Sequence, residues 1–113
     1  MAGKDFTFRG KKIDELIDKL AKKRFKNAEL YKKMGDYEAA KIYFQTIVRD
    51  FINSTWTPNA LYFIGECEIK LNETEKAKEI FEEFLKVFPE HKYAENAKFW
   101  IEQINKGEIE LKN

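Results

Sequence analysis

The sequence repeats itself with a period of 37 residues, and this feature constrains the fold more than any other. Internal self-similarity at a fixed period is the signature of repeat architectures. Shifted by one period, the chain aligns apolar residues with identical or similar ones: Phe44 with Phe81, Ala40 with Ala77, Phe51 with Phe88, Ala60 with Ala97 and Ile64 with Ile101. So many pairs in one register are poorly explained by chance. The 113 residues are therefore a short repeat array.

The composition excludes several other classes of protein. Hydrophobic residues make up 43% of the chain, which is too many for a disordered chain, and 2 Pro and 5 Gly are too few for a turn-rich β fold. A single Cys excludes an internal disulfide framework. No run approaches the roughly 18 apolar residues of a membrane helix, and residues 1–10 lack the apolar core of a signal peptide. The localisation is unknown: we expect a cytoplasmic protein, or a periplasmic one if the chain is a trimmed fragment of an exported protein.

The local signals predict helices throughout. The apolar spacing predicts helices over about 11–34, 37–50, 58–71, 74–88 and 93–105. The first of them begins with an amphipathic stripe, formed by Ile13, Leu16, Ile17, Leu20 and Ala21. Gly35 and Asn72 are placed to end the first and third helices in left-handed geometry, and Thr57-Pro58 reads as an N-cap followed by Pro at the first helical position.

This pattern divides the chain into repeats. We expect a flexible tail over 1–10 and one domain over 11–106, followed by a flexible tail over 107–113. Within the domain, residues 11–52 form a first repeat with an extended first helix, residues 58–89 form a second repeat, and residues 93–106 form a capping helix. Short turns make each helix pair antiparallel, and such pairs bury their apolar faces by stacking on neighbours.

The repeat units resemble the tetratricopeptide repeat. The resemblance covers about residues 21–105 and rests on residues at signature places: Ala28, Tyr31, Gly35, Tyr37, Ala40 and Phe44 in the first unit, and Gly65, Ala77, Phe81 and Pro89 in the second. Three positions depart from the signature, namely Ile52, Glu68 and Asn72, and the period exceeds the usual 34 residues. The runs 58–66 and 84–91 are similar to repeats of bacterial cell-envelope proteins, namely a Tol–Pal-associated periplasmic protein and an outer-membrane β-barrel assembly lipoprotein. The resemblance implies an all-α, right-handed stack of about five helices.

The resemblance also implies a ligand groove lined by the first helix of each pair. Three sets of partner-binding residues carry over, each repeating at the 37-residue period: Lys22, Asn59 and Asn96; Phe25, Tyr62 and Phe99; Glu29, Glu66 and Gln103. The aromatic set equally fits packing between repeats, and the two Asn equally fit helix capping. Both alternatives remain open at this stage.

Candidates for catalysis are few. Ser54 and His91 are one period apart, so they should occupy equivalent loops about 8–10 Å or more from each other. A nucleophile and its base need about 2.6–3.2 Å, so this pair is a poor dyad. Cys67 is expected to be a packed, unreactive thiol, because it lies mid-helix between two acidic residues. We expect no enzyme, no metal and no cofactor.

The expected partner is a protein or peptide. Residues 1–33 hold 11 Lys and Arg against 5 Asp and Glu, a net charge of +6, but the basic run 22–26 wraps around its helix, which makes nucleic acid an unlikely partner. The resemblance thus implies a non-enzymatic scaffold that binds a partner segment in the groove, with a place in bacterial envelope assembly. The alternative is a structural module that forms homo-oligomers through exposed end helices, since an array of fewer than three repeats is marginal.

Overall fold

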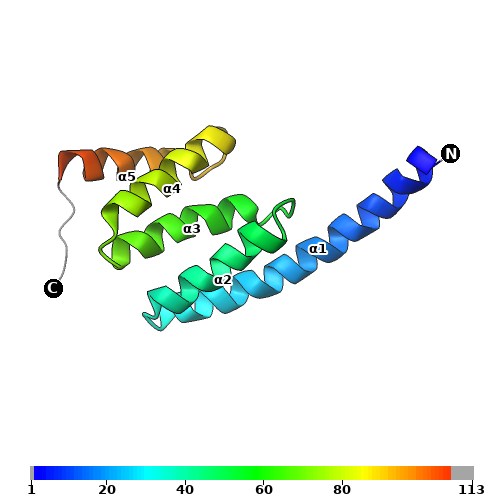
Figure 1. Ribbon diagram of the computed structural model, residues 1–113, viewed down its shortest axis with the longest axis horizontal. Helices are drawn as coiled ribbons and strands as arrows, with labels where there is room; N and C mark the ends of the chain where they lie inside the picture. The colour runs from blue at the N-terminus through cyan, green and yellow to red at the C-terminus, as the bar shows by residue number, and fades with distance from the viewer. Residues whose placement is uncertain (1, 108–113) are drawn as a thin grey trace.

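The protein is a stack of five α-helices in the part of the chain that the structure describes. The computed structural model describes the backbone of residues 2–107 and the side chains of residues 12–107. The helices are α1 (Ala2–Lys33), α2 (Tyr37–Asp50), α3 (Thr57–Lys70), α4 (Thr74–Val87) and α5 (Ala94–Lys106). Each helix packs against the one before it, and the described residues form no strand (Figure 1). The all-helical repeat architecture predicted from the period is confirmed.

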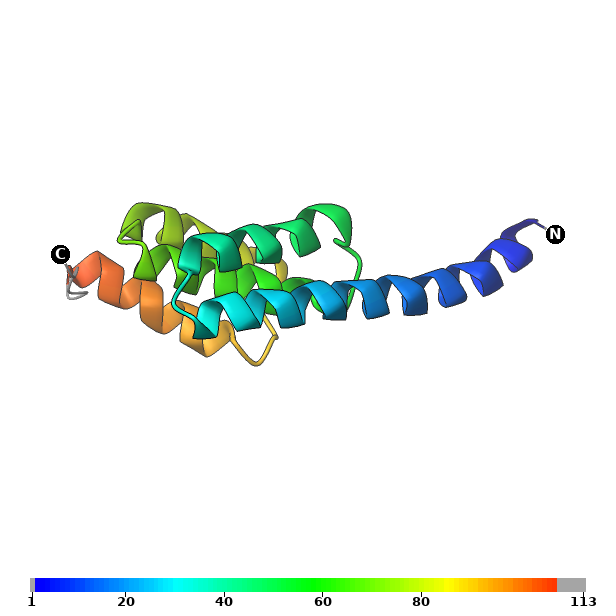
Figure 2. The same ribbon diagram turned by 90° about the horizontal axis from the view of Figure 1, so that it is seen from below.

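The first and second helices of the pairs lie on opposite sides of the molecule. In Figure 2, α2 and α4 follow one side, and α1 and α5 follow the other. The stack is elongated, with extents of 58 × 28 × 18 Å. No helix among the described residues is long and apolar enough to cross a membrane.

Helices α1 and α3 end in the left-handed turns that the sequence predicts. Gly35 has a φ of 80°, and Asp36 then donates its backbone N–H to the Tyr31 carbonyl at 2.9 Å. Asn72 has a φ of 64°, and Glu73 donates to the Glu68 carbonyl at 2.8 Å in the same geometry. Asn therefore substitutes for Gly in a left-handed C-terminal cap, because its short polar side chain tolerates a positive φ.

Two local predictions at helix starts are wrong. Helix α1 begins at Ala2, so residues 2–10 are the first turns of this helix, whereas the sequence predicted a tail. Residues 1 and 108–113, also expected in tails, lie outside the described residues. Thr57 is the first residue of α3, not its cap, and its hydroxyl donates to the Phe51 carbonyl at 3.0 Å. Its side chain therefore ties α3 back to the end of α2.

The N-terminal half of α1 extends beyond the other helices (Figures 1 and 2). The stripe predicted for this segment forms a helix but is only partly covered: Ala21 is fully buried in the core, whereas Ile13 is 53% exposed and Leu16 is 56% exposed. Near this stripe, the Asp18 carboxylate accepts from the backbone N–H of Thr55 at 2.8 Å and from its hydroxyl at 3.2 Å. These bonds fix the loop between α2 and α3 against α1.

The core consists of two clusters that share α3. One cluster joins α1 and α2 to one face of α3 through Ala60, Ile64 and Cys67. The other joins α4 and α5 to α3 mainly through Leu61, Tyr62 and Ile69. The alignment at 37 residues is preserved in this packing, because Phe44 and Phe81 are both fully buried, as are Ala40 and Ala77 in the same helices.

Gly65 lets α4 approach α3 closely. A Cβ atom built at this position would lie 2.5 Å from Cε1 of Phe81, whose ring is fully buried. Such a separation is a steric clash, and a well-packed interior leaves the ring little room to move. The small residue at this signature position is thus required by the α3–α4 contact.

Candidate functional site

Phe25 is a packing centre, and it is the first residue of the predicted aromatic set Phe25, Tyr62 and Phe99, called the ladder below. Phe25 is only 5% exposed. Its ring centroid lies 5.3 Å from that of Phe44 on α2, 4.8 Å from that of Trp56, and 5.9 Å from that of Phe63 on α3. Edge-to-face and tilted pairs at these separations are favourable beyond the apolar area that they bury. Phe25 therefore joins the first repeat to the second and is not available as a contact surface, contrary to its predicted role in partner binding.

The second aromatic position repeats the same contacts one period later. Tyr62 is 3% exposed, and its ring lies 5.5 Å from that of Phe81 on α4 and 4.6 Å from that of Tyr93. Its hydroxyl accepts a hydrogen bond from Nε1 of Trp100 at 3.1 Å. Burial, and then the nearby Glu66 carboxylate, raise the pKa of Tyr62 well above its usual value, so the phenol stays neutral. Tyr62, like Phe25, therefore serves mainly as a packing residue between the repeats.

The third aromatic position is exposed. Phe99 is 54% exposed, and its ring contacts that of Trp100 on the same helix, with centroids 5.9 Å apart. The rings that cover Phe25 and Tyr62 come from the second helix of the same repeat and from the repeat that follows. No described helix follows α5, so Phe99 lacks both sources of cover. Of the three ladder positions, Phe99 alone presents most of its ring to a ligand.

A hollow of about 360 Å³ opens between α3 and α5. Four of the nine predicted partner-binding residues line it, together with two residues that the sequence analysis did not single out. The lining residues are Tyr62, Glu66, Glu95, Asn96, Phe99 and Trp100. Their rings and polar groups come from two helices of different repeats. A concave site with aromatic walls and a few convergent polar groups is the usual form of a ligand site.

The face formed by α1, α3 and α5 continues from this hollow toward α1. Lys32 places Nζ 3.4 Å from Oε1 of Glu66 and 3.9 Å from the centroid of the Phe63 ring. Polar groups therefore cross the face from α1 to α5, in the order Lys32, Glu66, Tyr62 and Trp100. Lys32 and Phe63 were missed by sequence reasoning, because the pair depends on how two helices of different repeats are placed.

The remaining predicted residues do not line the hollow. Lys22 and Glu29 are exposed on α1, whereas Asn59 on α3 and Gln103 on α5 are partly exposed. The residues that the structure brings together are therefore those of α3 and α5. The extension along α1 stays a prediction.

The candidates for catalysis have structural roles. Ser54 Oγ accepts from the backbone N–H of Trp56 at 3.2 Å, and His91 Nδ1 accepts from that of Tyr93 at 3.0 Å. Both residues thus stabilise the turn that enters the first helix of the next unit. Burial and the adjacent Lys92 lower the pKa of His91. Among the described residues, no group of three or more His, Cys, Asp and Glu could hold a metal ion.

Cys67 is a buried thiol. It is 1% exposed in the cluster shared by α1, α2 and α3. Burial raises the pKa of the thiol to about 12, so almost none of it ionises near neutral pH. Since the thiolate is the reactive form, the side chain contributes packing and not chemistry.

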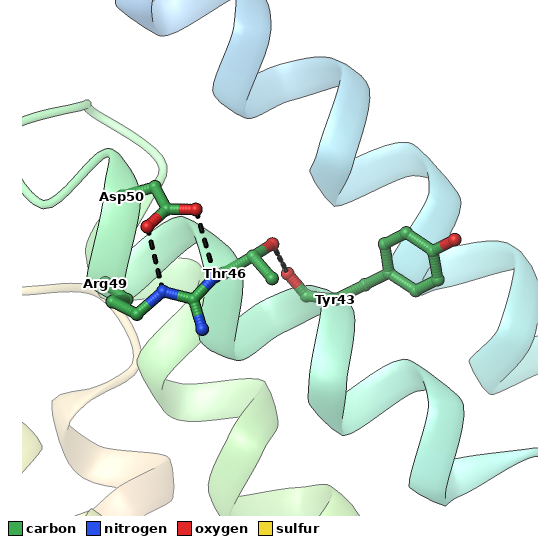
Figure 3. Close-up of polar contacts among 4 residues, drawn as sticks. All are labelled: Tyr43, Thr46, Arg49 and Asp50. Atoms are coloured by element: carbon green, nitrogen blue, oxygen red, sulfur yellow. Dashed lines mark hydrogen bonds and ion pairs between the residues drawn. The ribbon is translucent and has the colours of Figure 1, made fainter.

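The polar contacts in the C-terminal half of α2 do not form a ligand site. Thr46 donates its hydroxyl to the Tyr43 carbonyl at 2.6 Å, and the Arg49 guanidinium binds both oxygens of Asp50 at 2.8 and 3.1 Å (Figure 3). The hydrogen bond from Arg49 keeps the pKa of Asp50 below its usual value. All these residues belong to one helix, and Arg49 and Asp50 are exposed. They support α2 locally without converging on a space for a ligand.

Two parts of the chain match models of the tetratricopeptide repeat. Residues 24–49 match one such model and residues 59–91 match another. The matches fall on the two antiparallel pairs described above, and each includes the turn within its pair, with Gly35 inside the first match and Asn72 inside the second. No curated protein is similar enough in sequence to match the chain.

The ladder makes a prediction about stability. Phe25→Ala should lower the free energy of unfolding by about 3–5 kcal/mol, because it opens a cavity at the packing centre between the repeats. Phe99→Ala should change it by about 0.5 kcal/mol or less, because that side chain is mostly exposed. Urea denaturation followed by circular dichroism measures both, and Phe25→Leu provides a milder variant should the alanine variant not fold. Equal losses at positions 25 and 99 would show that the two rings are packed alike.

Proposed function

Because this chain belongs to the tetratricopeptide repeat family, we propose that it is a non-enzymatic scaffold that holds a segment of a partner protein against α1, α3 and α5. Tetratricopeptide repeats generally mediate interactions between proteins. The observation that carries the proposal is the hollow between α3 and α5, with the exposed ring of Phe99 at its edge. Rings of this kind supply much of the energy at protein interfaces.

The polar residues of the hollow suit a peptide backbone. Asn96 is exposed in the first turn of α5, and its amide can donate to a carbonyl and accept from an N–H at once. An extended segment exposes both kinds of group along its length. We therefore propose that Asn96 aligns the segment, while the rings of Phe99 and Trp100 bury an apolar part of it.

The partner proposed here belongs to the assembly of the bacterial cell envelope. The support is the similarity of the runs 58–66 and 84–91 to envelope repeats, and the second run includes the turn formed by His91. Fractionation of cells that carry the tagged full-length gene tests this placement: recovery with the cytoplasm would contradict it.

The scaffold proposal predicts where binding is lost. Peptides selected from a displayed random library against this chain should lose about tenfold or more in affinity with Phe99→Ala and with Asn96→Ala. Both residues are exposed, so folding should be preserved, as circular dichroism will check. Glu82→Ala on α4 is the matched control, because Glu82 is exposed on a helix of the opposite side. Peptides that bind both α5 variants as tightly as the unchanged chain would contradict the proposal.

A second candidate function is self-association through α1. The specific observation is the set of exposed apolar residues Ile13, Leu16 and Leu20 on α1, the helix whose N-terminal half extends beyond the other helices (Figure 1). Contiguous exposed apolar side chains are typical of surfaces that meet another protein. A second copy of this chain presents the same stripe, so two α1 helices can cover each other.

Sedimentation velocity tests this second candidate. The apparent mass of the chain should rise with concentration, and Leu16→Lys should abolish the rise, because it places a charge in the stripe. Ile52→Lys is the control, since Ile52 is also exposed but lies in the loop after α2. A mass that stays at the monomer value at every concentration would exclude self-association.

A further inference from the structure

The hollow between α3 and α5 combines aromatic rings with carboxylates. Tyr62, Phe99 and Trp100 provide the rings, and Glu66 and Glu95 provide the carboxylates. Among the described residues, no Lys or Arg lines it. A cation near an aromatic face is attracted by the ring, most strongly by Trp, and a nearby carboxylate adds to that attraction. The lining therefore favours a positively charged group over a negative or a neutral one.

The chain itself shows how this face holds an ammonium group. Lys32 Nζ lies over the Phe63 ring at 3.9 Å and pairs with Glu66 at 3.4 Å. One period later, the place of Phe63 is taken by Trp100, and the place of Lys32 is taken by Ile69. Ile69 is buried and carries no charge. The ammonium that covers the ring on the α1 side therefore has no equivalent on the α5 side among the residues that the structure describes.

The carboxylates of the hollow are open to a new partner. Glu95 pairs with Lys98 on its own helix at 3.3 Å, and both side chains are mostly exposed. Exposed ion pairs contribute little, so an incoming cation can replace Lys98 at small cost. The ion pair of Glu66 with Lys32 engages Oε1, and Glu66 borders the hollow from the α3 side. A cation in the hollow is thus within reach of carboxylates from two helices.

We infer that this hollow is a recognition site for a lysine or arginine side chain of the bound partner. The inference rests on the proposed scaffold function and specifies the chemistry of its ligand. The aliphatic stem of the side chain lies along Phe99, and the charged end meets Trp100, Glu66 and Glu95. The site thereby selects basic segments and rejects segments with an acidic side chain at that position.

Nuclear magnetic resonance with a defined probe tests this inference. The probe is N-acetyl-lysine N-methylamide, and its neutral counterpart is N-acetyl-norleucine N-methylamide, which has a similar stem without the charge. The chain contains 2 Trp, and each gives one indole N–H signal. The lysine probe should shift the signal of Trp100, which lines the hollow. The signal of Trp56, which packs on Phe25 in the other cluster, should stay in place.

The expected affinity for lysine is about tenfold higher than for norleucine. Glu95→Gln and Glu66→Gln should each weaken the lysine probe severalfold, whereas Glu82→Gln, which removes the same charge from α4, should not. Glu95 is exposed, so its variant should fold even if the Glu66 variant is destabilised. Equal affinity for both probes, no shift at Trp100, or unchanged binding by the Glu95 variant would overturn the inference.

The outcomes for the two proposals are separable. If the lysine probe fails while selected peptides still require Phe99 and Asn96, the scaffold function stands and its preference for a cation is wrong. If the lysine probe binds while selected peptides ignore both residues, the hollow recognises cations but the proposed docking of a partner segment is wrong.

Discussion

The structure depends on one aromatic ring in the first helix of each repeat. Phe25 and Tyr62 occupy equivalent positions, and three contacts of the first ring recur around the second at a spacing of 37 residues. In each case the partners lie in the second helix of the same unit and in the unit that follows. The ring therefore fixes both the pairing of two helices and the register in which the next unit stacks.

The same arrangement explains why a surface for binding lies at α5. Phe99 occupies the ring position of the third unit, but the described part of the chain supplies no second helix and no following unit to cover it. A residue type that packs the core elsewhere thus becomes an exposed ring beside a hollow. The carboxylates and the amide that surround it come from α3 and α5, which share one core cluster and are joined by the hydrogen bond from Trp100 to Tyr62.

Much of the fold could be predicted because both the residue types and the contacts between them recur from one unit to the next. Phe44 and Phe81 align in sequence and are both fully buried, and Ser54 and His91 align and stabilise equivalent turns, before α3 and before α5. Asn72 was correctly identified as a substitute for Gly, since few other residues accept a positive φ.

The parts that could not be predicted depend on what lies next to a residue in space. Phe25 and Phe99 have the same place in the pattern, yet within the described part of the chain only Phe25 is followed by another unit. The stripe of Ile13 and Leu16 predicts a helix correctly, but its spacing does not reveal whether the rest of the chain covers it. Likewise, Lys32 lies in a Lys-rich helix, and only the placement of α3 puts its ammonium over Phe63.

The central claim is that partners bind on the side of the first helices, at the hollow between α3 and α5. Mapping amide chemical shifts of the ¹⁵N-labelled chain, with one tightly bound library-selected peptide added, tests it most directly. The claim predicts that the largest changes occur at Glu66, Asn96, Phe99 and Trp100, with smaller ones along α1. Changes concentrated on the exposed residues of α2 and α4 would contradict it, because the peptide would then occupy the opposite side of the stack.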